Sequence, residues 1–125
     1  MVTTDTTQLN RECNAWREQL RSYRETMGQL HDQLQELARH QQDKEVLSEV
    51  EHYYNQFYIQ QVNIHDLKQA IKLHERKMLL EQGPGDHPLT DQTLSEHEQL
   101  NDRYESLEQT IRELVDDFGH FSGRA

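Results

Sequence analysis

The fold is decided by residues 9–37, which read LNRECNAWREQLRSYRETMGQLHDQLQEL. Mostly apolar side chains recur there in steps that alternate between four and three residues: Leu9, Cys13, Trp16, Leu20, Tyr23, Met27, Leu30, Leu34 and Leu37. This spacing keeps one face of an α-helix apolar over four heptads, as in the packing seam of a coiled coil. We therefore predict one long amphipathic helix over this stretch.

The same rhythm occurs twice more along the chain. The second seam contains the polar residues Gln60 and His74 and comprises Val46, Val50, Tyr53, Phe57, Gln60, Ile64, Leu67, Ile71, His74 and Met78. The third begins at the polar His97 and comprises His97, Leu100, Tyr104, Leu107, Ile111, Leu114, Phe118 and Phe121. Three seams of similar length predict three helices that share one core.

The breaks between the seams set the helix boundaries. The run Gly83-Pro84-Gly85-Asp86-His87-Pro88 cannot continue a helix. The nine residues from Leu37 to Val46 would place two seams on opposite faces of one continuous helix, so we predict a reversal over 40–44. We predict helices over 6–40, 44–82 and 91–118, with Asp43 and Thr90 as N-caps and Gly119 ending the last helix.

The sequence therefore predicts an all-α protein, an antiparallel up-down-up three-helix bundle with coiled-coil-like heptad seams. Residues 1–125 form a single domain with short flexible termini in this prediction. The net charge of −10 disfavours an ordinary binder of nucleic acid or of an anionic membrane. We expect neither a signal peptide nor a membrane span, and the single cysteine fits a reducing cytoplasm.

Aligning the three seams brings the polar seam residues into two layers. His74 and His97 share a layer with Leu9, and Cys13 occupies the next layer. Neutral imidazoles on facing helices are ligands for transition metals, and a cysteine thiolate can join them. The alternative is a half-solvated polar layer near the open end of the bundle. The second layer pairs Tyr23 with Gln60, which we interpret as a buried polar pair that fixes the register.

Two surfaces are candidates for contact with a partner. Residues 54–62 carry an outward stripe, consisting of Tyr54, Tyr58, Ile59 and Val62, that the three seams do not need. The predicted helix 91–118 holds nine acidic residues against Arg103 and Arg112, a net charge of −7. An acidic face of this kind can meet a basic partner or steer association.

No catalytic constellation is recognisable in the chain. There is no glycine-rich phosphate loop, no HExxH and no GxSxG pattern. We therefore expect a small, non-catalytic, cytosolic interaction bundle that binds a protein partner or another copy of itself and needs no cofactor. The alternative is a metal-binding or metal-responsive bundle that uses His74 and His97, with Cys13 as a third ligand.

Overall fold

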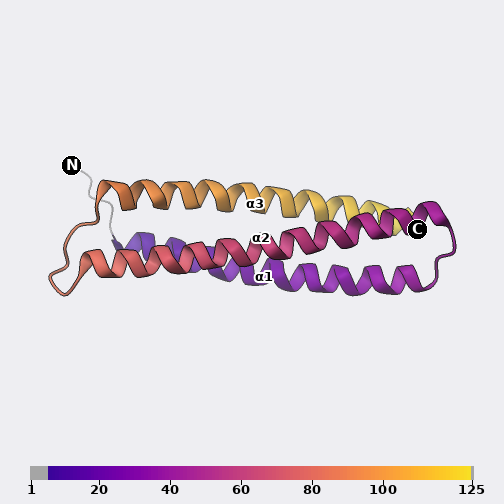
Figure 1. Ribbon diagram of the computed structural model, residues 1–125, viewed down its shortest axis with the longest axis horizontal. Helices are drawn as coiled ribbons and strands as arrows, with labels where there is room; N and C mark the ends of the chain where they lie inside the picture. The colour runs from indigo at the N-terminus through magenta and orange to yellow at the C-terminus, as the bar shows by residue number, and fades with distance from the viewer. Residues whose placement is uncertain (1–5, 125) are drawn as a thin grey trace.

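The computed structural model describes residues 6–124, which form the helices α1 (Thr6–Arg39), α2 (Lys44–Gln82) and α3 (Asp91–Arg124). Figure 1 shows them side by side in one elongated bundle, with the chain turning back at each connection. The prediction of a three-helix, all-α protein is confirmed, and the ends of α1 and α2 agree with it within one residue. Within the described range, no helix is long and apolar enough to cross a membrane.

The connections between the helices are made as their residues suggest. The Asp43 side chain accepts a hydrogen bond from the backbone N–H of Glu45, which caps α2. Thr90 does the same for α3, because its Oγ1 accepts a bond of 3.2 Å from the N–H of Thr93. At the end of α2, Gly83 adopts a φ of 58°, which favours glycine, and its N–H donates to the carbonyl of Leu79.

The core follows the predicted seams, whose members are buried or partly buried along all three helices. Toward the α1–α2 connection, aromatic rings of α2 and α3 pack against one another. Ring centroids lie 5.2 Å apart for Phe57 and Phe118, 5.4 Å for Tyr53 and Phe118, and 5.0 Å for Tyr53 and Phe121. This aromatic cluster occupies one end of the bundle, and the histidine layer occupies the other.

The predicted end of the third helix is wrong. α3 continues through Gly119 to Arg124, so no flexible tail begins at residue 119. Burying a side chain such as Phe121, which is 2% exposed, contributes about 1.5–3 kcal/mol, whereas a glycine inside a helix costs about 1 kcal/mol. Packing therefore outweighs the glycine signal. The prediction of a flexible N-terminus concerns residues 1–5, which lie outside the described residues.

This position of Gly119 makes a testable prediction. A Cβ atom added there would meet nothing within 4 Å, so Gly119→Ala should stabilise the protein by about 0.5–1 kcal/mol. Chemical denaturation of the two proteins measures the difference. If alanine destabilises the protein, residue 119 adopts instead the left-handed conformation of a glycine that ends a helix.

Candidate functional site

Two histidines meet in the core near the N-terminal end of α1. His74 of α2 and His97 of α3 are each only 5% exposed, and their atoms Nε2 and Nδ1 lie 2.9 Å apart in a hydrogen bond. The predicted layer is thus present, and its alternative description as half-solvated is wrong. Two imidazoles this deep in a narrow bundle need defined partners, because an unpaired buried polar group is costly.

A carboxylate on α1 defines the proton positions in this layer. Glu12 Oε1 lies 3.0 Å from His97 Nε2, and a carboxylate can only accept, so His97 carries its proton on Nε2. With both rings neutral, His97 Nδ1 then accepts from His74 Nε2–H. The ring of Trp16 packs on His97 at a centroid distance of 4.8 Å and helps to fix its orientation.

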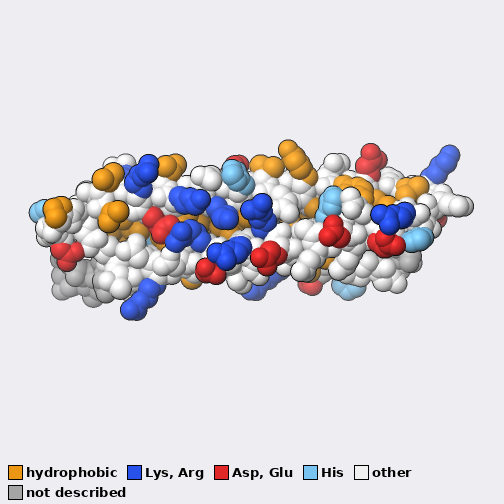
Figure 2. All heavy atoms as spheres, turned by 90° about the horizontal axis from the view of Figure 1, so that it is seen from below, with side chains coloured by type: hydrophobic (Ala, Val, Ile, Leu, Met, Phe, Trp, Pro, Cys, Tyr) orange, Lys and Arg blue, Asp and Glu red, His pale blue; other side chains and the backbone are white. Residues whose placement is uncertain are grey.

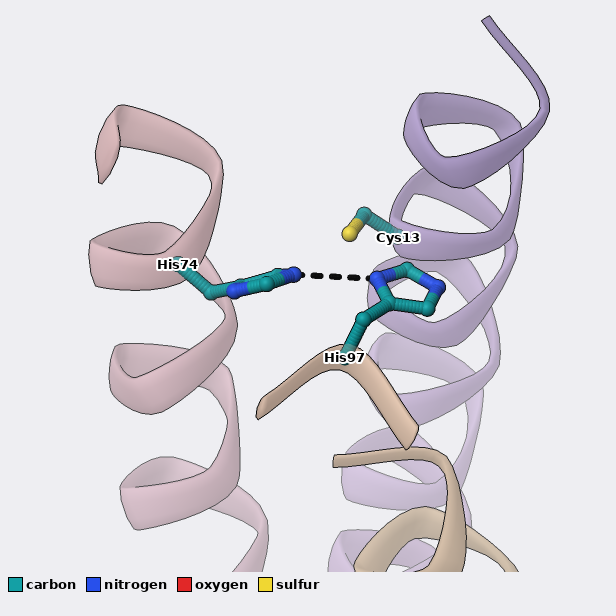
Figure 3. Close-up of side chains that lie close together, drawn as sticks. All are labelled: Cys13, His74 and His97. Carbon is teal, nitrogen blue, oxygen red and sulfur yellow. Dashed lines mark hydrogen bonds between the residues drawn. The ribbon is translucent and has the colours of Figure 1, made fainter. Parts of the chain in front are cut away.

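Cys13 completes this cluster. Its sulfur and one nitrogen from each of His74 and His97 all lie within 4.8 Å of one another, and all three residues are buried. Figure 3 shows the three side chains pointing toward one another from α1, α2 and α3, with the sulfur close to the hydrogen bond between the rings. The three residues thus converge at one point, although the seam alignment had put Cys13 one layer away.

The environment of Cys13 does not favour a nucleophile. Burial, together with the nearby negative charge of Glu75, raises the pKa of the thiol to about 12. Reactive cysteines have lowered pKa values and are accessible to substrate, whereas this one is protonated and fully buried. Two imidazole nitrogens and one sulfur instead form a donor set that binds Zn²⁺ or copper ions in preference to Mg²⁺ or Ca²⁺.

Sequence reasoning missed the carboxylate that matters. That carboxylate is Glu12; among the other glutamates nearby, Glu75 pairs with Arg17 at 3.2 Å, and Glu96 pairs with Lys77 at 2.8 Å. Glu98 lines a surface depression beside His97. The position of Glu12 follows from the register between α1 and α3. In this register residue 12 contacts residue 97, and residue 23 contacts residue 108.

The histidine layer makes the stability of the metal-free protein depend on pH. Burial lowers the pKa of His74 below its usual 6.5, and the neighbouring His97 lowers it further. As the pH falls through about 6.5, His74 becomes protonated in the unfolded chain but stays neutral in the folded protein. The free energy of unfolding therefore falls. We expect lower unfolding free energy at pH 5.5 than at pH 7.5, and a smaller difference in His74→Leu/His97→Leu. Equal slopes would contradict this expectation.

The predicted polar pair of Tyr23 and Gln60 has separate partners. Gln60 is buried and accepts a hydrogen bond from Asn63 at 3.2 Å, whereas Tyr23 is only partly buried. The hydroxyl of Tyr23 donates to Glu108 of α3 at 2.8 Å, as does that of Tyr104 at 2.7 Å. These two bonds lower the pKa of Glu108. The interpretation of Tyr23 as a buried partner of Gln60 is therefore wrong.

The outward stripe on α2 is longer than the sequence suggested. Tyr58, Ile59 and Val62 are exposed as expected, but Tyr54 is partly buried and packs against His31. In the described part of the chain, every large hydrophobic side chain that is well exposed belongs to α2: Leu47, Tyr58, Ile59, Val62, Leu73, Leu79 and Leu80. Sequence reasoning missed the four leucines, none of which belongs to a seam.

Charge is also unevenly placed on α2. Its first turns carry Glu45, Glu49 and Glu51 against Lys44, whereas residues 68–77 carry four basic side chains against Glu75. Figure 2 shows Lys and Arg side chains gathered left of the middle of the molecule, and hydrophobic side chains along its upper edge. The exposed Tyr58, Ile59 and Val62 therefore lie between an acidic and a basic segment of α2.

Comparison of the chain with protein-family models, with curated proteins and with solved structures found no match.

Proposed function

We propose that this protein is a non-catalytic assembly module of the cytosol that pairs with a second copy of itself through α2. One observation carries the proposal: the well-exposed large hydrophobic side chains of the described chain all belong to α2. Tyr58, Leu73 and Leu80 are 70%, 66% and 74% exposed, respectively. Apolar side chains gathered on one element of an otherwise hydrophilic surface are typical of an interface.

The residues of this surface are arranged so that it can face a copy of itself. We define the outer face of α2 by positions that recur in steps of three and four: Leu47, Glu51, Tyr54, Tyr58, Val62, His65, Gln69, Leu73, Arg76 and Leu80. All are exposed except Tyr54, which is partly buried. Two such helices can lie antiparallel so that the numbers of two facing residues always add up to 127. In this register every residue of the outer face lies opposite another residue of the outer face.

The chemistry of the facing residues agrees with this register. Leu47 meets Leu80 of the second copy, and both are apolar. Glu51 meets Arg76, so the acidic segment of one copy lies against the basic segment of the other. A symmetric dimer forms each contact twice, because a two-fold interface places the same patch on both sides. Charge complementarity of this kind fixes orientation and disfavours other registers.

A second copy is favoured over an unrelated protein by this self-complementarity. A partner of another sequence could bind through the apolar residues alone. Such binding would give no reason for the acidic and basic segments of α2 to match each other. The two-fold axis would pass near residues 63–64, close to the middle of the helix Lys44–Gln82. The acidic α3, with nine acidic and three basic residues over 91–124, stays outside this contact.

Sedimentation or native mass measurement tests the proposal. The wild type should have twice the 15.0 kDa mass of one chain at high concentration. Tyr58→Glu/Val62→Glu places carboxylates inside the interface, which costs several kcal/mol, so self-association should weaken by at least about a hundredfold. The control Gln92→Glu/Ser95→Glu adds the same charge to exposed positions of α3 and should leave the mass unchanged. A wild type that stays monomeric, or a dimer that both variants retain, would refute the proposal.

A further inference from the structure

We infer that Cys13, His74 and His97 form a binding site for one borderline-soft transition-metal ion of the Zn²⁺ type. The inference does not rest on pairing through α2, because the three residues are buried between the helices and none belongs to the outer face. Zinc takes cysteine sulfur and histidine nitrogen together, commonly in four-coordinate sites. Each helix of the bundle contributes one of the three residues.

The distances suit a site that closes around an ion. Two nitrogens bound to one tetrahedral zinc at roughly 2.0–2.1 Å lie about 3.4 Å apart. His74 Nε2 and His97 Nδ1 are 2.9 Å apart, joined by a proton that the metal would replace. The sulfur, within 4.8 Å of both nitrogens, would have to approach them by about 1 Å at most.

The surroundings of His97 resemble the outer shell of a metal site. A metal-bound histidine usually donates its other N–H to a carboxylate or carbonyl, which fixes the tautomer and strengthens the ligand. The bond of 3.0 Å to Glu12 does this and leaves the lone pair of Nδ1 directed at His74. Glu12 thus satisfies the buried N–H of His97 without a metal, and it already holds the ring in the tautomer that a metal ligand needs.

Binding of an ion releases or moves the protons that Cys13 and His74 hold in the metal-free protein. The metal takes the Cys13 sulfur as thiolate, so the S–H bond breaks and one proton leaves to solvent. It also takes His74 through Nε2, and the proton held there moves to Nδ1, a buried nitrogen that has no hydrogen-bond partner. His97 keeps its proton on Nε2. One proton is therefore released for each ion bound.

An ion also has a way to approach. A surface depression of about 420 Å³ reaches His74 between α2 and α3, and another of about 360 Å³ reaches His97 between α1 and α3. Water in either depression can supply a fourth ligand. Once bound, the ion would join all three helices near one end of the bundle, so it should stabilise the folded protein in proportion to its affinity.

Titration with ZnCl₂ tests the site, using reduced protein from which any affinity tag has been removed. We expect one ion per chain by calorimetry and a rise in melting temperature of roughly 15 °C when free zinc exceeds its dissociation constant a thousandfold. Co²⁺ serves as a second probe, because a thiolate ligand gives it a charge-transfer band in the ultraviolet. That band should be present in the wild type and absent from Cys13→Ala.

Variants separate the site from adventitious binding. Glu12→Gln should weaken zinc binding by roughly 10–100-fold, and Cys13→Ala should weaken it more, because it removes a direct ligand. Cys13→Ala replaces one small buried side chain by another, so the folded protein should tolerate it. His52→Ala and His120→Ala remove exposed histidines and should bind as the wild type does.

Several outcomes would overturn the inference. They are the absence of stoichiometric zinc binding, unchanged affinity in Cys13→Ala, or an equal loss in His52→Ala. Tyr58→Glu/Val62→Glu should bind zinc with wild-type affinity whether or not it dimerises. Failure of the metal site and failure of pairing through α2 can therefore be told apart.

Discussion

Replacing His97 alone by leucine should destabilise the metal-free protein by about 1–3 kcal/mol, whereas replacing His74 and His97 together should be close to neutral or stabilising. The single change leaves His74 Nε2–H in the core without the acceptor that it has at 2.9 Å. The other nitrogen of His74 already lacks a partner, so the whole imidazole would be unsatisfied. The double change removes both polar groups and adds apolar volume to the seam.

Urea denaturation at pH 7.5 in the presence of a chelator measures both effects. A double variant at least as stable as the wild type would mean that the two histidines are not kept for stability, which is what a binding site predicts. A double variant that loses more than the single variant would contradict this account and would assign the layer a structural role.

Replacing Phe57 by alanine should lower the free energy of unfolding by about 3–5 kcal/mol. The ring is 1% exposed and packs against both Tyr53 and Phe118, so its removal leaves a cavity between α2 and α3. Neighbouring rings cannot fill that space without leaving their own contacts. A loss of this size is a large part of the total stability of an ordinary domain.

The same denaturation series provides the control. Asn55→Ala changes an exposed position two residues away and should alter stability by no more than about 0.5 kcal/mol. A loss below about 1 kcal/mol for Phe57→Ala would show that the aromatic cluster is loosely packed, contrary to the ring distances.

The helices and the histidine layer could be predicted because both follow from spacing. Steps of three and four residues locate the buried side of a helix, and Asp43 and the glycine–proline run locate its ends. Once three buried sides are known, the polar residues among them fall into layers. The spacing therefore predicts that His74 and His97 share a layer.

The remaining features depend on contacts that spacing does not contain. Gly119 lies inside α3 because Phe121 beyond it is buried, and a glycine signal cannot weigh that packing. Glu12 reaches His97 through the pairing of α1 with α3, 85 residues apart in sequence. Leu73 and Leu80 belong to none of the three seams, and their exposure of 66% and 74% is known only once the helices are packed.

Disulfide cross-linking tests the central claim, pairing of two chains through the outer face of α2, most directly. Positions 47 and 80 lie about 50 Å apart along one helix, so a disulfide between them must join two chains. In a Cys13→Ala background, Leu47→Cys/Leu80→Cys should form a dimer on mild oxidation, with positions 47 and 80 linked by peptide mapping. Leu47→Cys alone and Leu80→Cys alone should pair without a covalent link, because the new cysteine then faces a leucine of the second copy. Cross-linking of either single variant as readily as the double variant, or none in the double variant, would contradict the claim.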